Sequence, residues 1–309
     1  MKKTYDINNP MAPLWLMYPH ISRYSIGWRM GYGESYAWEF GDWYSSLIIE
    51  EQKKYQLMFP EPIGWLGWYE QEYTDKDIYD EDYLLWNKGA HMKYSINSLQ
   101  KDFKKGKKIK YLFFWGHQPS YDGSITKTCL SQWWKSDFSV GINEYCCMEQ
   151  YMMAEKARLF EDNEILEEIL RSCHPKQIKE LGRKVRNFNE DLWKRRRYSI
   201  ILNGNYAKFL QNENLRQFLM QTKNRVLVEA SPYDKIWGIG MSADNEKINN
   251  PLLWNGQNLL GFALMEVRDE LIRVCQNDKK LDLNELRKKF DENVFVKERD
   301  DFRCVYLEK

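Results

Sequence analysis

The chain has 309 residues, and its 46 lysines and arginines almost balance its 45 aspartates and glutamates, which leaves a formal net charge of +1. A hydrophobic fraction of 43% with 29% charged residues is typical of a folded globular protein and excludes a disordered one. The neutral balance argues against the broad basic surface with which proteins grip long DNA. Because no apolar run approaches the ~18 residues that a membrane span needs, and no apolar signal segment follows the N-terminus, we expect a cytoplasmic protein without membrane contact.

Aromatic residues dominate the first third of the chain. Tryptophan, tyrosine and phenylalanine make up 15% of the sequence, and seven of the 13 tryptophans lie in the first 86 residues. Aromatic and apolar side chains at three- and four-residue spacing predict a helix over residues 36–56. The charged run 101–108 is typical of a solvated connection. We therefore place a boundary there and treat residues 1–105 as an aromatic-rich N-terminal extension whose role the sequence does not reveal.

The pattern changes after this boundary. Residues 111–115 and 225–229 are short runs of aromatic or β-branched side chains, which predict strands. Periodic apolar positions predict helices over 145–160, 163–171, 175–185, 191–202, 212–221, 257–275 and 281–290. A loop is expected over 231–250, and residues 294–307 could form an edge hairpin. The expected fold class is therefore α+β and helix-rich, with its main domain over 106–275 and a C-terminal helix and tail over 276–309.

The cysteines and histidines exclude the common metal and disulfide arrangements. The six cysteines contain no C-x-x-C pair, and Cys146 and Cys147 are adjacent. The four histidines are scattered and form neither H-x-x-x-H nor H-E-x-x-H. These patterns predict reduced, mostly buried thiols and no metal site. A P-loop, a dinucleotide fingerprint after a strand and a nucleophile elbow are absent from the sequence as well.

The helix expected over 145–160 carries the most informative pair of side chains. Glu149 and Lys156 are seven residues apart, which is about two helical turns, so they share one face. Burial would raise the pKa of the Glu149 carboxyl and lower that of the Lys156 amine toward neutrality, as acid–base or Schiff-base chemistry requires. The same spacing also suits a structural ion-pair network, and spacing alone does not separate the two interpretations.

Three further segments could carry function or only structure. Asp234 lies in a Pro/Gly loop after the second strand, where it could act on a substrate or cap a turn. Trp193 begins a helix beside a run of lysine and arginine, where it could stack on a base or belong to the core. The start of the helix near residue 257 could bind an anion through free N–H groups or be capped by Asn255.

Taken in order along the chain, several motifs resemble the NADAR (YbiA-like) family. The first are Cys129-Leu130-Ser131-Gln132-Trp133-Trp134 and Cys147-Met148-Glu149-Gln150-Tyr151-Met152, the second being followed by Lys156-Ala157. The later ones are Leu181-Gly182-Arg183, Trp193, Ala207-Lys208-Phe209, Leu227-Val228-Glu229-Ala230-Ser231, Asp234-Lys235-Ile236-Trp237-Gly238-Ile239-Gly240, Trp254-Asn255-Gly256-Gln257-Asn258-Leu259-Leu260-Gly261 and Met265-Glu266-Val267-Arg268. Together they cover roughly residues 111–275, and so many matches in order are far more specific than one motif.

The resemblance implies an N-glycosidase, which cleaves the bond between a ribosyl C1 and a nitrogen. One branch of the family acts on ribosylamino-pyrimidine phosphates of riboflavin biosynthesis. Another removes ADP-ribose from guanine in nucleic acid, as the antitoxin to a DarT-type ADP-ribosyltransferase. Many riboflavin-branch members have Glu-His-Tyr where this chain has Glu149-Gln150-Tyr151, which favours the second branch.

The ligands implied are therefore ADP-ribose and ADP-ribosylated nucleic acid, with a DarT-like toxin as genetic partner and with no cofactor or metal. Two alternatives stay open. One is an N-glycosidase that acts on riboflavin-type ribosylamino intermediates, and the other is a non-enzymatic sensor of ADP-ribose or NAD.

By the same resemblance, Glu149 and Asp234 lie around the ribose and Lys156 lies beside its C1. A carboxylate there would stabilise the positive charge that develops at C1 as the base departs. Either a carboxylate orients a water for direct displacement, or Lys156 attacks the opened ribose and forms a Schiff base, which the shared Glu–Lys pair favours. The substrate-binding residues implied are Ser131, Arg183, Trp193, Trp237, Gly238 and Asn258, with Trp193 stacking on a ring and Arg183 meeting phosphate.

Overall fold

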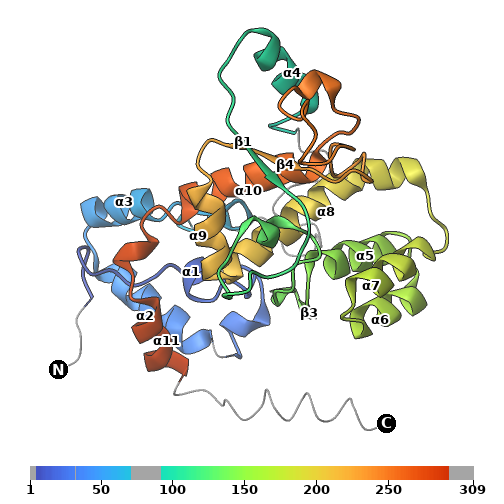
Figure 1. Cartoon of the computed structure of the whole chain (residues 1–309). Helices are drawn as coiled ribbons and strands as arrows, with labels where there is room; N and C mark the ends of the chain where they lie inside the picture. Colours follow the sequence, from blue (N-terminus) through green and yellow to red (C-terminus); the bar gives the residue numbers. More distant parts are fainter. Residues whose placement is uncertain (1–4, 32, 71–91, 292–309) are drawn as a thin grey trace. The chain divides into compact units, whose positions relative to one another are not determined.

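The computed structural model describes residues 5–31, 33–70 and 92–291 (Figure 1). The chain divides into two compact units. The first unit combines Met1–Tyr79 with Arg273–Lys309, and the second is Asp80–Ile272. These divisions lie elsewhere than at the expected positions 105 and 275. Helix α4 (Ile96–Lys104) belongs to the second unit, and the C-terminal helix belongs with the N-terminal extension. The hairpin considered for 294–307 lies outside the described residues.

The first unit is built on an aromatic core. Its helices are α1 (Leu14–Met17), α2 (Glu34–Ser46), α3 (Ile49–Met58) and α11 (Leu283–Asp291). Trp15 is 1% exposed, and its ring contacts those of Trp65, Trp68 and Tyr69 with centroids 5.4 to 5.7 Å apart. The buried Tyr55 donates its hydroxyl to the carbonyl of Met11 at 2.9 Å. The aromatic residues of this region are therefore accounted for largely by packing against one another.

The single helix expected over 36–56 is wrong, because the chain breaks it in two. Leu47 and Ile48 are extended, and the N–H of Ile48 donates to the Glu51 carboxylate at 3.3 Å at the start of α3. The break brings α3 back against α2, so that Phe40 and Tyr55 meet with ring centroids 5.9 Å apart. Periodicity extends across such a break, since a two-residue bend leaves the apolar spacing nearly intact.

The second unit contains two small sheets. Strand β1 (Tyr111–Phe114) pairs in parallel with β4 (Val226–Glu229), in a register that places Phe114 opposite Glu229. Strand β2 (Phe138–Val140) pairs antiparallel with β3 (Asn143–Tyr145). Because parallel strands end at the same edge of a sheet, the loops that follow β1 and β4 leave from neighbouring positions. Both predicted strands are confirmed.

Helices make up most of the second unit. They are α4, α5 (Met148–Leu159), α6 (Asn163–Arg171), α7 (Pro175–Arg183), α8 (Glu190–Gln211), α9 (Glu213–Gln221) and α10 (Leu259–Val274). Helix α5 packs against α6, α7 and α8, and Figure 1 shows α6 and α7 beside it. It begins three residues later than predicted, because Asn143–Tyr145 pairs with β2 instead. In the part of the chain that the structure describes, no helix is long and apolar enough to cross a membrane.

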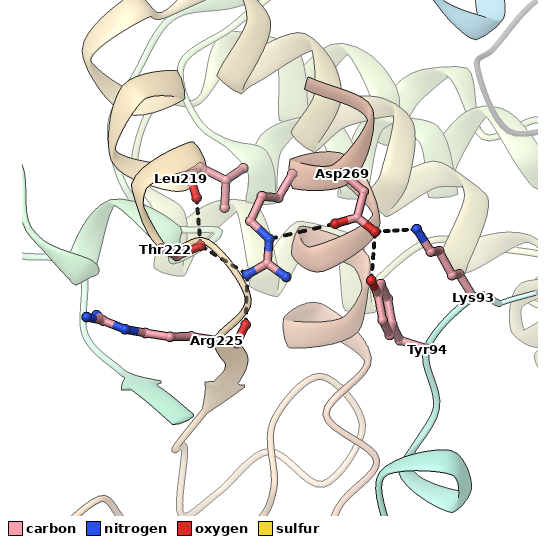
Figure 2. A network of polar contacts seen from close by, with 7 residues as sticks. Lys93, Tyr94, Leu219, Thr222, Arg225 and Asp269 are labelled. Atoms are coloured by element: carbon pink, nitrogen blue, oxygen red, sulfur yellow. Dashed lines mark hydrogen bonds and ion pairs between the residues drawn. The ribbon is translucent and has the colours of Figure 1, made fainter. Parts of the chain in front are cut away.

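A polar network connects Lys93 and Tyr94 to α10 (Figure 2). The Asp269 carboxylate accepts from the Lys93 ammonium and, at 2.7 Å, from the Tyr94 hydroxyl. Next to it, the buried Arg268 donates to Thr222 Oγ1 at 3.1 Å and to a carbonyl of the α9–β4 connection. The buried Glu266 accepts from the N–H of Lys93 at 2.9 Å. This part of α10 is therefore structural.

Candidate active site

Glu149 lies in the first turn of α5, with its carboxyl group buried. Its N–H donates to the carbonyl of Gln132 at 2.9 Å, and the residue is 3% exposed. Burial raises the pKa of Glu149 to about 7, although the Lys179 cation and a hydrogen bond from the Trp133 indole both oppose the shift. A carboxyl with this pKa is divided between its acid and base forms at neutral pH, which suits general acid–base chemistry.

A second buried carboxyl group, that of Glu229, lies at the end of β4. Burial raises the pKa of Glu229 to about 8, and the negative charges of Asp234 and Glu149 add to the shift. Its Oε2 atom is buried and has no hydrogen-bond partner among the described residues. Burying a carboxyl oxygen without a partner is costly, so its retention indicates a role other than stability. Glu229 was missed as a candidate, although it ends the strand predicted over 225–229.

Asp234 completes the group of carboxylates and also caps its own loop. Its Oδ1 accepts from the N–H groups of Ile236 and Trp237, both at 2.8 Å, and its own N–H donates to Ser231 Oγ at 3.2 Å. Its charge raises the pKa of both Glu149 and Glu229, so it lies within electrostatic reach of each. The cap and the candidate functional role are therefore compatible, since capping fixes the carboxylate in place.

Two cations close to these carboxylates each lie beside a tryptophan ring. Lys179 Nζ lies 5.7 Å from the Trp133 ring centroid, and its charge lowers the pKa of both buried glutamates. Arg197, which is 9% exposed, lies 5.9 Å from the centroid of Trp237. The exposed Arg183, at the end of α7, also lowers the pKa of Glu149. Glu149, Asp234 and Arg183 are thus brought together as predicted candidates, along with cations and rings that suit phosphates and bases.

Lys156 lies about two turns along α5 from Glu149. Its contacts are a backbone carbonyl and aromatic rings. Its ammonium donates to the carbonyl of Gly182 at 2.6 Å and lies 4.4 Å from the Phe188 ring centroid. The Trp193 ring, at the start of α8, is 5.9 Å away. Burial lowers the pKa of the Lys156 amine, which increases its neutral, nucleophilic fraction. Lys156 and the half-buried Trp193 are therefore neighbours.

Three other predicted residues act on the backbone of the site. Asn258 is fully buried at a φ of 55°, and its side chain accepts from the N–H of Glu229 at 3.0 Å and donates to a β4 carbonyl. A Cβ on Gly238 would lie 2.8 Å from the Glu229 carbonyl oxygen, so glycine permits this close approach. Ser131 Oγ accepts from the N–H of Trp133 at 3.1 Å. Each of the three holds a segment that carries one of the side chains described above.

Comparison with known proteins identifies the family to which the sequence of this region belongs. Residues 113–272 match the NADAR domain. The chain is also 43% identical over 167 residues to N-glycosidase R617 of Acanthamoeba polyphaga mimivirus, a match covering 52% of this chain and 96% of that protein. The chain belongs to the NADAR domain family. The predicted family and the predicted helix-rich α+β class are both confirmed.

Bacterial relatives of the NADAR domain are more distant. N-glycosidase YbiA of Escherichia coli strain K12 is 31% identical over 123 residues, which is 40% of this chain and 68% of that protein. The NMR structure of the E. coli protein YbiA aligns with a TM-score of 0.43 and 25% identity, covering 53% of this chain and 86% of that one. The carboxylates, cations and rings of the candidate site all lie inside the matched residues 113–272.

The side chain of Gln150, next to Glu149 in the sequence, binds backbone groups. Its amide nitrogen donates to the carbonyls of Ile169, Leu170 and Ser172 at 2.8 to 3.1 Å, and its oxygen accepts from the N–H of Cys146 at 2.7 Å. The side chain therefore binds the C-terminal carbonyls of α6, which a helix leaves without partners of its own. In this chain Gln150 makes a structural contact, and its use as a marker of the substrate branch stays a prediction.

The three carboxylates of the NADAR domain do not form a metal site. Across residues 5–31, 33–70 and 92–291, no three His, Cys, Asp or Glu side chains are arranged to hold one metal ion. Besides one another and Asp234, the charged groups that act on the two glutamates are the Lys179 cation at both and the Arg183 cation at Glu149. What the arrangement offers chemically is a proton donor, a proton acceptor and fixed positive charge.

Proposed function

We propose that this chain is an N-glycosidase that removes ADP-ribose from a modified guanine in nucleic acid, and that it reverses the action of a DarT-type ADP-ribosyltransferase. The observation that carries the proposal is the convergence of Glu149, Glu229 and Asp234, with carboxyl pKa values of about 7 and about 8 for the two glutamates. The relatives that are named N-glycosidases support the reaction type. The surrounding cations and rings support a substrate that contains phosphates and bases.

The two glutamates divide the proton transfers of hydrolysis between them. The bond between the ribosyl C1 and the guanine nitrogen breaks, and its electrons leave with the nitrogen. Glu229, mostly protonated at pH 7, donates a proton to that nitrogen. Ionised Glu149 stabilises the positive charge at C1 and takes a proton from the attacking water, whose hydroxyl joins C1. Asp234 keeps the pKa of both glutamates high.

A second route reaches the same products through Lys156. In that route the neutral amine attacks C1 of the opened ribose, the base leaves, and water hydrolyses the resulting Schiff base. The lowered pKa of Lys156 supports it. Borohydride reduction during turnover separates the two routes. A trapped adduct in the parent chain that disappears in Lys156→Ala supports the Schiff base, whereas turnover without an adduct supports direct displacement.

The cations and rings take the rest of the substrate. Lys179, Arg183 and Arg197 bind the two phosphates of ADP-ribose, since each is close to a carboxylate that the ribose would approach. Trp193 and Trp237 stack on rings of the ligand. These contacts need neither a cofactor nor a metal.

The test uses an oligonucleotide that carries one ADP-ribosylated guanine, with free ADP-ribose as the measured product. The parent chain is expected to release it, and Glu149→Gln is expected to reduce release by roughly 10²- to 10⁴-fold. Glu155→Gln is the matched control, since Glu155 lies on the same helix and pairs with Arg158. Binding without release, unchanged by Glu149→Gln, would make the chain a sensor. Cleavage of ribosylamino-pyrimidine phosphates to ribose phosphate and the free aminopyrimidine, without release of ADP-ribose from the oligonucleotide, would place it in the other branch.

The proposed partner is tested in cells. Co-production of the chain should restore growth that a DarT-type enzyme with guanine specificity arrests, and the Glu149→Gln variant should not. Growth arrest that the parent chain leaves unchanged would contradict the partner while leaving the glycosidase reaction intact.

A further inference from the structure

Trp115 and Tyr233 form a pair of exposed rings on the loops that follow β1 and β4. Trp115 is 52% exposed and Tyr233 is 86% exposed, and their ring centroids are 6.4 Å apart with an interplanar angle of 53°. Elsewhere in the second unit, the contacting rings Phe138, Tyr145 and Tyr151 are buried. Two large aromatic side chains held together in water leave apolar surface that a ligand would cover.

Two observations place the pair next to the candidate active site: adjacency in sequence, and a contact between rings. On one side, Trp115 directly follows Phe114, which is opposite Glu229 in the sheet, and Tyr233 directly precedes Asp234. On the other side, the ring of His117, two residues after Trp115, lies 5.3 Å from that of Trp133. The Trp133 indole donates to the Glu149 carboxylate.

We propose that Trp115 and Tyr233 form a second base-binding subsite, which stacks an unpaired base adjacent to the modified guanine. The subsite rests on the proposed function and extends it from one nucleotide to a single-stranded polynucleotide. Exposed aromatic faces stack any base regardless of sequence, but only where the base is not already covered in a duplex. The exposed Lys235, two residues after Tyr233, supplies a cation for a flanking phosphate.

The subsite predicts a difference between two substrates that share the scissile bond. One is an unpaired oligonucleotide with one ADP-ribosylated guanine, and the other is ADP-ribosylated guanosine alone. Trp115→Ala and Tyr233→Ala are expected to lower kcat/KM on the oligonucleotide by about tenfold. They should leave kcat/KM on the nucleoside nearly unchanged, because it has no neighbouring base. Tyr233→Phe and Trp115→Phe should restore most of the loss, since they keep a ring.

A matched control lies on the same loop as Trp115. Tyr121 is fully exposed, and Tyr121→Ala should change neither substrate. An equal loss on both substrates would overturn the proposal, because it would place the adenine of ADP-ribose on the rings. No loss on either substrate would overturn it as well.

A binding measurement separates failure of the subsite from failure of the proposed function. An unmodified single-stranded oligonucleotide containing 2-aminopurine should lose fluorescence on binding the parent chain, and less so with Trp115→Ala. Quenching that depends on Trp115, without release of ADP-ribose from either substrate, supports the subsite and contradicts the proposed reaction. Release of ADP-ribose without any quenching supports the reaction and contradicts the subsite.

Discussion

The two units of this chain use aromatic residues in opposite ways. In the first unit the rings pack on one another, as Trp15 does with Trp65 and Trp68. In the second unit the tryptophans of the candidate site lie against cations, as Trp133 does with Lys179 and Trp237 with Arg197. Buried rings whose neighbours are rings therefore indicate a role in stability, whereas rings beside cations near buried carboxylates indicate a role in ligand binding.

The largest expected effect is on catalysis, through the proposed general acid Glu229. Glu229→Gln should reduce ADP-ribose release by roughly 10²- to 10⁴-fold, because glutamine cannot donate the proton. The same substitution should stabilise the chain at pH 8 and not at pH 5. The folded pKa of Glu229, about 8, is raised above the unfolded value, so burial of the carboxyl costs stability increasingly as the pH rises toward 8.

The measurement is urea unfolding at both pH values, together with the release assay. We expect a gain of about 1–3 kcal/mol at pH 8. Glu167→Gln is the control, since Glu167 is an exposed surface residue paired with Arg171. A loss of stability at pH 8 would mean that the Glu229 carboxylate is held by contacts that favour its charged form.

The aromatic core of the first unit gives the next effect. Trp15→Ala should cost about 3–5 kcal/mol of unfolding free energy, because it leaves a large cavity among rings. Trp38 is 70% exposed, and Trp38→Ala should cost less than about 1 kcal/mol. Chemical unfolding followed by circular dichroism measures both. Equal costs would break the contrast between buried rings and the rest of this unit.

Replacing a tryptophan of the candidate site by alanine should weaken substrate binding and leave the stability of the chain largely unchanged. Trp193→Ala is expected to raise KM for the modified oligonucleotide about tenfold, since a stacking contact is lost. Because Trp193 is only half-buried, its unfolding cost should stay below about 1–2 kcal/mol. Steady-state kinetics and urea unfolding report the two quantities. A large stability loss with unchanged KM would assign Trp193 to the core.

The smallest expected effect is a shift of the pH dependence of the reaction when Lys179 is replaced. Lys179 lowers the pKa of both Glu149 and Glu229, so Lys179→Met should raise both. The acidic limb of the kcat/KM profile, near pH 7 in the parent chain, should therefore move to higher pH by up to about one unit, and the alkaline limb with it. A profile that keeps its midpoints would show that Lys179 acts only on the Trp133 ring.

Most helices of the second unit and both strands of the parallel sheet were predictable, because apolar spacing follows backbone geometry directly. Helix α4 was not, since the lysines at its end were attributed to a solvated connection. The bend at Leu47 was not, since it hardly disturbs that spacing. Glu229 could have been recognised, because a charged residue at the end of a buried strand needs a reason. The alternatives for Asp234 could not be resolved from sequence, because its side chain both caps the loop and places a charge near the glutamates.

The attachment of Lys93 and Tyr94 to α10 decides where the chain can be shortened. A fragment that begins at residue 106 keeps the whole NADAR match but loses the groups that bind Asp269 and the N–H that binds the buried Glu266. Both carboxylates would then stay on α10 with fewer partners. Asn258 directly precedes α10, and its side chain accepts from the N–H of Glu229. A truncation that removes Lys93 and Tyr94 and disturbs α10 would therefore also disturb the position of Glu229 in the candidate site. A fragment intended for assay or crystallisation should therefore begin no later than residue 92.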